Sequence, residues 1–348
     1  MRPLAPALRP LPLDRLRGPN NEGVLVVSIV VLSLVVGAVD SSFWSVRTLL
    51  NIGSASLENV VFAMAVLIVI ISGGIDVSFM AIGIFAGYGV IVLTGSTGFG
   101  ASSAWVGFVL AAGIGVLLGS LNAAAIAGLR LPTLIVTLGT QGIIRGAMLA
   151  YVGSKVIPNY PQGLDRLSTD YLFTASSSAG DTRLNILIIP AVLICLLVSL
   201  LLRYTTLGRG IYAIGGDAES ARRAGFRVAG TQVFIYLFAG LLAGVAGMMH
   251  VTQVRLANPY ELVGGELDVI AAVVLGGTSI FGGKGSVSGT VLGVVLIALI
   301  KNSLILLGVP GTWQRATVGL LLLIGVSAQA LSARVRRRHV DFLAQASA

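Results

Sequence analysis

Few residues of this chain could do chemistry, and the most informative ones stand in two glycine-rich segments. The first runs from Ser72 to Ser78 (SGGIDVS), and the second runs from Leu275 to Gly285 (LGGTSIFGGKG). Glycine adopts backbone conformations that other residues resist, so each segment can turn sharply or unwind. Asp76 in the first segment could belong to a functional site. It could equally cap the helix that follows, because Asp is a favoured N-cap residue.

The patterns of known catalytic sites are missing from the sequence. The stretch Phe281–Ser286 (FGGKGS) is close to a phosphate-binding loop, but Gly285 stands where that motif needs Ser or Thr, and Thr278 stands where it needs glycine. There is one cysteine, Cys195, there are two histidines, and no hydrolase or metalloprotease motif appears. We therefore expect no catalytic residue, no metal and no cofactor, and we do not expect an enzyme.

The composition identifies the environment that must position these segments. The chain of 348 residues is 55% hydrophobic and only 11% charged, whereas soluble domains are about 25% charged. So much apolar surface cannot be buried inside one water-soluble domain, so we expect an integral membrane protein. The apolar runs are continuous and do not alternate with polar residues, which argues against a β-barrel. The predicted fold is an all-α, polytopic bundle of transmembrane helices.

We expect about ten transmembrane helices, because a helix needs ~20 residues to cross ~30 Å of hydrocarbon. The expected organisation is a cytoplasmic tail (1–23), a transmembrane permease domain (24–332) and a second cytoplasmic tail (333–348). The predicted spans are 24–40, 54–72, 78–95, 104–128, 132–152, 184–203, 231–252, 266–281, 285–308 and 312–332.

The Lys and Arg residues predict the orientation of the chain. With both termini in the cytoplasm, fifteen Lys and Arg residues fall in inner segments and five in outer segments. Cytoplasmic loops of membrane proteins have this excess. The formal net charge of +9 therefore reflects orientation, and we expect no nucleic-acid partner.

The two glycine-rich segments each separate a pair of short apolar runs. Paired interruptions in the two halves of a membrane protein indicate a translocation path, since unwound backbone at membrane depth must line a cavity or be buried in protein. The alternative is that both are ordinary tight turns. Asn122 and Arg145 lie within predicted spans, where each could bond a neighbouring helix or face a polar path. Repeated pairs of glycines four residues apart predict close helix packing.

The longest inner loop, 204–230, contains a predicted two-turn helix at 218–224. Asp217 can cap it, Glu219 lies in its first turn, and Arg222 and Arg223 lie in its last turn before Gly225. So short a helix is not stable alone in water. It could rest on anionic lipid, or it could dock a cytoplasmic partner.

The outer loop, 153–183, is too long for a simple helix connection. It contains Tyr160, Tyr171 and Phe173, which are residue types found at protein interfaces. It could be a disordered connector, but we favour an ordered cap that contacts an extracytoplasmic protein.

Four motifs, in order, resemble the membrane permease subunits of bacterial ABC importers of the ribose/monosaccharide class, which includes the autoinducer-2 permeases. The resemblance covers about residues 50–330. The motifs are SGGIDVS at 72–78, LPTLIVTLGT at 131–140, LGRGIYAIGG at 207–216 and ELDVIAAVVLGGTSIFGGKG at 266–285.

The resemblance implies a location in the bacterial inner membrane and several partners. These are a second permease copy in a homo- or heterodimer, an ATP-binding subunit that hydrolyses ATP, and an extracytoplasmic sugar-binding protein. It also implies that the mid-chain cytoplasmic loop couples the permease to the ATPase. That role falls here on Gly215, Gly216, Asp217, Glu219, Arg222, Arg223 and Gly225, in agreement with the helix predicted at 218–224.

We expect the transported molecule to be a monosaccharide or a similar polyhydroxylated solute. Scattered polar groups suit brief contacts with it. The predicted path residues are Gly73, Gly74, Asp76, Ser78, Asn122, Thr137, Glu266, Asp268, Gly276, Gly277, Gly282 and Gly283. The chain departs from the family pattern at Phe79, Met80 and Ala81, and at Ala123 after Asn122, which leaves the substrate open. The alternative function is an ion-coupled secondary transporter, for which Asp76 would be the plausible relay group.

Overall fold

The fold is described from a computed structural model of the chain. The described residues are 22–98, 103–158, 161–177, 180–314, 316–320, 323 and 327. Most of the two predicted tails, and Tyr160 of the outer loop, lie outside them. The predicted division into tails and permease domain therefore stays a prediction.

The described chain is a bundle of helices with one small hairpin, which confirms the polytopic all-α prediction. The longer helices are α2 (Glu22–Val39), α3 (Val46–Ile71), α4 (Phe79–Thr97), α5 (Ala104–Ala123), α6 (Thr133–Ala147), α8 (Ile188–Tyr204), α11 (Val228–Val254) and α13 (Val287–Leu306). The shorter elements are η1 (Ser41–Trp44), η2 (Ala124–Gly128), η3 (Met148–Val152), α7 (Gln162–Thr169), β1 (Tyr171–Ser177), β2 (Gly180–Asn185), α9 (Thr206–Gly216), α10 (Ala218–Arg223) and α12 (Glu266–Leu275).

The number of spanning helices differs from the ten expected. Seven described helices are long and apolar enough to cross a membrane, or eight if α8 and α9, bent by 74°, form one span. The predicted span 266–281 is a helix only over its first ten residues, α12. At 1.5 Å per residue it rises about 15 Å, roughly half the hydrocarbon thickness. The predicted span 312–332 falls largely outside the described residues.

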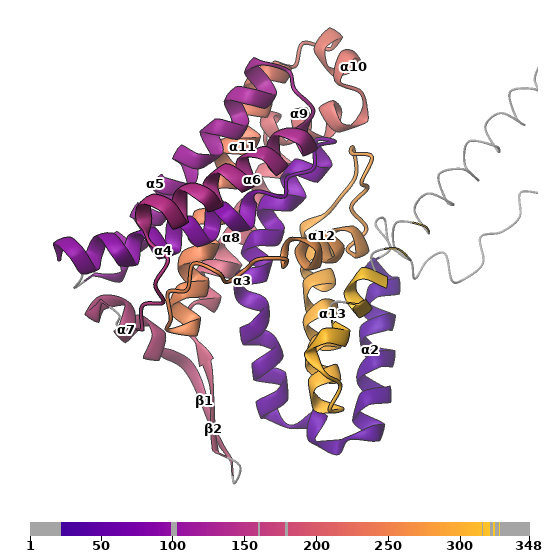
Figure 1. Ribbon diagram of the computed structural model, residues 1–348. Helices are drawn as coiled ribbons and strands as arrows, with labels where there is room; N and C mark the ends of the chain where they lie inside the picture. The colour runs from indigo at the N-terminus through magenta and orange to yellow at the C-terminus, as the bar shows by residue number, and fades with distance from the viewer. Residues whose placement is uncertain are drawn as a thin grey trace, which may run out of the picture.

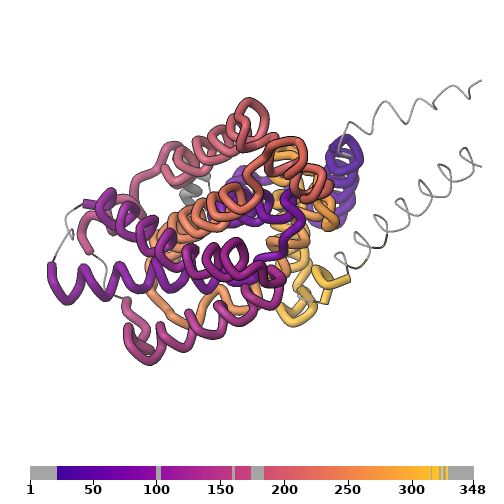
Figure 2. Tube along the Cα trace, turned by 90° about the horizontal axis from the view of Figure 1, so that it is seen from above, coloured from indigo at the N-terminus to yellow at the C-terminus, as the bar shows by residue number. Residues whose placement is uncertain are grey.

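Helices α3 and α11 form the centre of the bundle. Phe62 and Leu67 of α3, and Ala243 and Met249 of α11, are fully buried in the main hydrophobic core. Helix α11 packs against α5, α4 and α3, while α3 also contacts α13 and α8. Seen from above, α11 runs through the middle of the bundle (Figure 2). By contrast, α2 buries only Leu25 and Val36.

Glycines allow the central helices to approach backbone to backbone. A Cβ added at Gly115 of α5 would collide with the carbonyl oxygen of Gly240 on α11, and one at Gly119 would lie 2.5 Å from the carbonyl oxygen of Tyr236. This confirms the predicted packing role for these spaced glycines. The pair Gly142 and Gly146 on α6 differs, because a Cβ there would meet no atom of the described chain within 4 Å.

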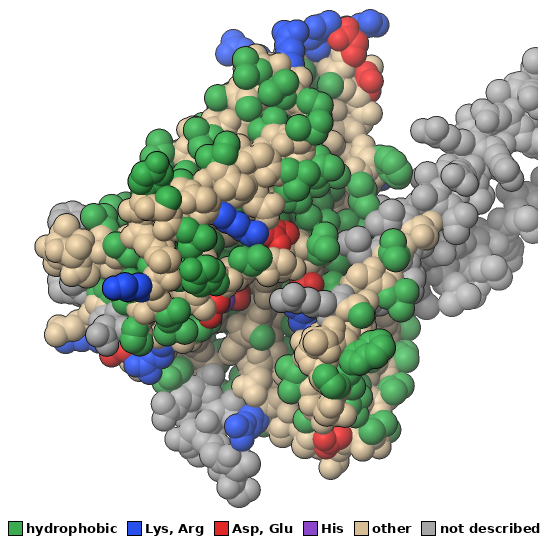
Figure 3. Space-filling view, in the orientation of Figure 1, with side chains coloured by type: hydrophobic (Ala, Val, Ile, Leu, Met, Phe, Trp, Pro, Cys, Tyr) green, Lys and Arg blue, Asp and Glu red, His purple; other side chains and the backbone are tan. Residues whose placement is uncertain are grey.

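The two ends of the bundle have different structures. Helix α10 lies at one end, and the β1–β2 hairpin lies at the other (Figure 1). The Ser286 hydroxyl donates a hydrogen bond to Glu22 at 2.8 Å, so helix α2 begins near α13's first turn. Lys, Arg, Asp and Glu side chains gather at the end that contains α10 (Figure 3). The outer loop is ordered in part, because it contains α7 and two antiparallel strands, which the sequence did not predict.

We predict that Gly115→Val destabilises the bundle whereas Gly113→Val on the same helix does not. Gly115 faces the backbone of α11, while a Cβ at Gly113 meets nothing within 4 Å in the described chain. Overpacking of this kind costs about 1–3 kcal/mol or more. The apparent melting temperature in detergent, measured by fluorescence-detected size exclusion, should fall only for Gly115→Val. Equal melting temperatures would contradict the backbone contact.

Candidate translocation and coupling sites

The predicted cytoplasmic helix is present as α10. The Asp217 carboxylate caps it by accepting a hydrogen bond from the Ser220 backbone N–H at 2.6 Å. Hydrogen bonds from the Ser220 side chain and backbone lower the pKa of Asp217 below its usual value. The chain leaves the helix through Gly225, whose φ of +89° lies in the left-handed region that favours glycine.

The charged side chains of α10 are exposed and pair with one another. Glu219 forms ion pairs with Arg222 at 2.7 Å and with Arg223 at 3.2 Å. Both arginines remain more than 60% exposed, at 66% and 79%. Exposed pairs of this kind add little stability, so they leave the two guanidinium groups available to a partner.

The last turn of α9 contacts both glycine-rich segments. The Gly283 N–H donates a hydrogen bond to the Ile71 carbonyl oxygen at 2.8 Å. A Cβ at Gly215 would collide with that same carbonyl, and a Cβ at Gly282 would lie 2.9 Å from the Cα atoms of Gly215 and Gly73. We call Ile71, Gly73, Gly215, Gly282 and Gly283 the glycine joint. It brings predicted coupling and path residues together in one contact.

The joint is continuous with α10. Gly215 and Gly216 end α9, and only Asp217, the cap residue of both helices, separates α9 from α10. The Tyr212 hydroxyl of α9 also donates to the Gly285 carbonyl at 2.8 Å. A displacement of α10 would therefore reach both glycine-rich segments directly through α9. These segments consequently lie at the α10 end of the bundle.

A buried hydrogen-bond network holds the polar residues of the first segment. Asp76 accepts from the backbone N–H and the hydroxyl of Ser78, each at 2.7 Å. The Asn122 amide donates to the Ser78 hydroxyl at 2.7 Å, and the Thr140 hydroxyl donates to Asn122 at 2.6 Å. All four side chains are buried. Asp76 therefore braces the turn before α4, whose N-cap residue is Ser78, and Asn122 bonds neighbouring elements.

Helix α6 also fixes the backbone of this segment. The Ile75 N–H donates to the Thr133 hydroxyl at 3.1 Å, and the Thr137 hydroxyl donates to the Ile75 carbonyl at 3.2 Å. Thr137 was a predicted path residue, and Thr133 was not. Gly74 faces Tyr236, because a Cβ there would lie 2.8 Å from its hydroxyl oxygen.

A second polar set connects α6, α12 and α13. Arg145 forms an ion pair with Glu266, which also accepts a hydrogen bond from Gln141 at 2.7 Å. Lys301 forms an ion pair with Asp268. Gln141 and Lys301 were not among the predicted path residues, although each is a polar residue in an apolar helix. Such residues in a membrane usually face one another or a water-filled cavity.

A histidine held between two carboxylates was not predicted from the sequence. His250 on α11 contacts Glu58 on α3 through Nδ1 at 2.8 Å and Glu261 through Nε2 at 2.9 Å. Glu58 inside a predicted span was the signal that could have revealed it. No group of His, Cys, Asp and Glu side chains within the described ranges is arranged to hold a metal ion.

The glycines of the second segment have two different roles. Gly276 lies against α13, because a Cβ there would lie 2.6 Å from the carbonyl oxygen of Gly289. Gly277, like Gly282 and Gly283, has a positive φ, at +88°. These positions therefore turn the backbone between α12 and α13.

Comparison with known proteins identifies the family. Residues 48–326 match the family described as the permease component of the branched-chain amino acid transport system. The chain belongs to this family. Among its relatives are the autoinducer 2 import system permease proteins LsrC of Yersinia pseudotuberculosis (strain IP 31758) and Yersinia pestis (strain Pestoides F), each 32% identical over 306 residues. The alignment covers 87% of this chain and 83% of each relative.

The LsrC protein of Yersinia enterocolitica is 33% identical, with 87% of this chain and 81% of the relative covered. No solved structure matches the chain at a significant level. The resemblance to importer permeases is confirmed. The chain is a permease component and a multi-pass protein of the inner membrane. The family membership supports this function over an ion-coupled secondary transporter.

We predict that Gly215→Ala impairs transport far more than Gly216→Ala. The methyl group at 215 would collide with the Ile71 carbonyl, whereas at 216 it would meet no described atom within 4 Å. The glycine joint would have to open, so uptake should fall by roughly tenfold, the effect of about 1.4 kcal/mol. ATP-driven uptake, compared at equal amounts of the two variants in the membrane, measures this loss. Equal uptake by the two variants would show that the joint is not needed for transport.

Proposed function

We propose that this permease belongs to an ATP-driven importer of a monosaccharide or a similar neutral, polyhydroxylated small molecule. The observation that supports this substrate class is the similarity to the three Yersinia proteins, which are named as permeases of autoinducer 2 import. Their alignments extend over 87% of this chain. The four sequence motifs point to the same class of permease.

The proposed partners meet opposite ends of the bundle. An ATP-binding subunit docks on α10 and hydrolyses ATP, while an extracytoplasmic binding protein delivers solute at the hairpin end. The exposed arginines of α10 support the first contact, and the exposed Leu172 and Phe173 of the hairpin support the second. A second permease copy, identical or related, completes the path.

Transport then follows from alternating access. Closure of the ATP-binding subunits displaces α10, and the glycine joint passes this displacement to both glycine-rich segments. The proposed path residues are the polar groups and glycines predicted from the sequence, to which we add Gln141, Arg145 and Lys301. Their hydrogen bonds to one another leave only weak contacts for the solute, which suits passage better than capture.

A second candidate substrate is a branched-chain amino acid, because the family description names that transport system. Such a solute has a carboxylate and an ammonium group, which need separate charged partners in the path. The two substrates can therefore be distinguished directly by uptake.

We expect vesicles that contain the complete importer and its binding protein to take up autoinducer 2 or D-ribose with ATP, and not to take up leucine. Uptake of leucine alone would contradict the proposed substrate class.

In the same vesicles, Arg222→Glu with Arg223→Glu should abolish uptake and release the ATP-binding subunit, because both charges in the proposed docking surface are reversed.

The matched control for this double variant is Lys155→Glu with Arg166→Glu, which reverses two charges in the outer loop. It should keep the ATP-binding subunit bound in a pull-down. If Arg222→Glu with Arg223→Glu keeps the subunit bound as well, α10 is not its docking site and rests on lipid instead.

The outer hairpin generates a separate prediction. Leu172 and Phe173 are 57% and 55% exposed, and exposed apolar anchors of this kind are typical of interfaces. Leu172→Asp with Phe173→Asp should reduce uptake that depends on the binding protein while the ATP-binding subunit still co-purifies. Undiminished uptake would mean that the hairpin does not contact the binding protein.

A further inference from the structure

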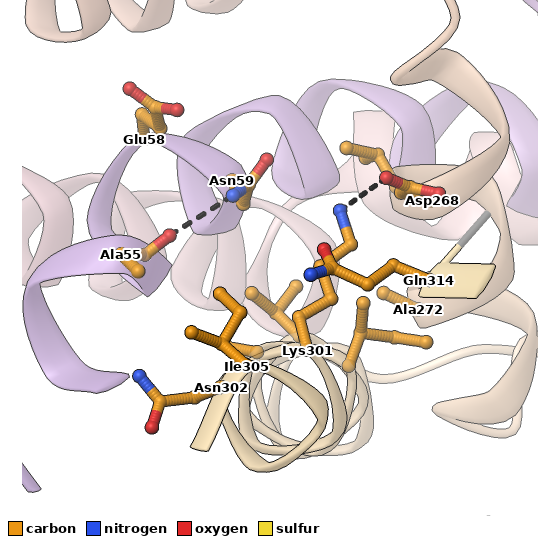
Figure 4. Close-up of a pocket in the computed structure, with 13 residues that line it drawn as sticks. Ala55, Glu58, Asn59, Asp268, Ala272, Lys301, Asn302, Ile305 and Gln314 are labelled. Carbon is orange, nitrogen blue, oxygen red and sulfur yellow. Dashed lines mark hydrogen bonds and ion pairs between the residues drawn. The ribbon is translucent and has the colours of Figure 1, made fainter. Parts of the chain in front are cut away.

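A polar cavity of about 320 Å³ lies between α3, α12 and α13. Figure 4 shows its lining, with Lys301 and Asp268 joined across it and the Gln314 side chain beside them. Its apolar wall includes Ala55, Ala272 and Ile305. Six polar side chains line it: Glu58, Asn59, Asp268, Lys301, Asn302 and Gln314.

The charged side chains that line the cavity already have partners. The positive charge of Lys301 is paired with the negative charge of Asp268. The Glu58 carboxylate is bonded to His250 at 2.8 Å, and in Figure 4 it points away from the ion pair. The uncharged amide groups therefore determine what this cavity can bind.

Side-chain amide groups and sugar hydroxyl groups are complementary in hydrogen bonding. Each side-chain amide offers both donors and acceptors, and each sugar hydroxyl can donate and accept. Asn302 and Gln314 approach the cavity from different segments, and the Asn59 amide donates to the Ala55 carbonyl at 3.0 Å, which leaves its oxygen as an acceptor. An amino acid zwitterion would instead have to compete with the existing Asp268–Lys301 ion pair.

The size of the cavity fits a small solute. It lies at the lower end of the range of about 300–1,000 Å³ found for small-molecule sites, and it has room for about ten water molecules at roughly 30 Å³ each. A second, larger cavity of about 860 Å³ lies between α3, α8 and α13. That cavity is lined by more apolar side chains, including Leu57, Val60 and Leu196, and is less suited to a polyhydroxylated molecule.

The position of the cavity couples it to the glycine joint. Asp268 and Ala272 of its wall belong to α12, which leads into the second glycine-rich segment after Leu275. That segment contacts Gly215 through Gly282 and Gly283. A displacement that starts at α10 can therefore move one wall of the cavity relative to α3.

We propose that this cavity is a transient binding site for the neutral polyhydroxylated solute on its way through the permease. The proposal rests on the proposed function and names the place where the solute is held. Amides from α13 and from 311–314 bind its hydroxyl groups, and the Asp268–Lys301 pair supplies the remaining donors and acceptors. Movement of α12 then weakens these contacts and releases the solute.

The experiment uses the fact that Cys195 is the only cysteine of the chain. In a Cys195→Ala background, Asn302→Cys is labelled by a charged, membrane-impermeant methanethiosulfonate in vesicles with the complete importer. Autoinducer 2 and D-ribose are the probes, and leucine is the control solute. The matched control variant is Val109→Cys on α5, which is 71% exposed. It lies near the outer end of α5, as Asn302 lies near the outer end of α13.

We expect Asn302→Cys to be labelled and Val109→Cys to resist labelling, because lipid excludes a charged reagent. Saturating polyol, at about ten times its Kd, should slow labelling of Asn302→Cys roughly tenfold, by the factor 1 + [L]/Kd. Leucine should not slow it. Asn59→Cys provides a second position if Asn302→Cys is poorly inserted.

Two results would overturn the proposal. If neither cysteine in the cavity is labelled, the cavity is closed by lipid or by a second permease copy. If both are labelled at the same rate with and without a polyol that the vesicles import, the solute takes another route. Failure of the vesicles to import any polyol is a different result, because it contradicts the proposed substrate class, and protection by leucine would then assign the cavity to an amino acid.

Discussion

The carbonyl group of Ile71 is the contact on which the α10 end of this permease depends. It accepts the Gly283 N–H at 2.8 Å and leaves no space for a side chain at Gly215. Three segments that are distant in sequence therefore meet backbone to backbone. Glycine is required here for two reasons, the closeness of the contact and the positive φ of Gly282 and Gly283. Only Asp217 separates α9 from α10, so α10 lies directly beside these contacts.

The polar residues within the bundle follow a second constraint, since lipid offers no hydrogen-bond partners. Two sets share α6, and His250 with Glu58 and Glu261 forms a third. Thr140 belongs to the network around Asp76, while Gln141 and Arg145 bind Glu266 at the start of α12. Because these groups pair with one another, their burial costs little free energy and they bind a solute only weakly. In the proposed binding site, the amides near the Asp268–Lys301 pair would therefore make only brief contacts with a solute.

Much of the fold could be predicted from the sequence because the bilayer imposes length and polarity on each helix. The apolar runs predicted the spanning helices, and the capping residues predicted α10 to within one residue. The expectation for 266–281 was wrong in its second half, because composition did not show that α12 ends at Leu275 and that the chain then turns through Gly277. The hairpin was missed because its strands lie in a loop without regular alternation of apolar and polar residues.

The sequence by itself determined which segments were candidates for the site, but not how their residues contact one another. It singled out both glycine-rich segments, Asp76, Asn122 and the 218–224 helix, because glycine and charge are conspicuous in an apolar chain. Only the tertiary structure decided that Gly215 contacts both segments, that the Asp76 carboxylate binds Ser78 within its own turn, and that Lys301 faces Asp268. Such contacts join residues far apart in the chain, and helix rotation and interhelical distance, which depend on the packing of the whole bundle, decide whether they form.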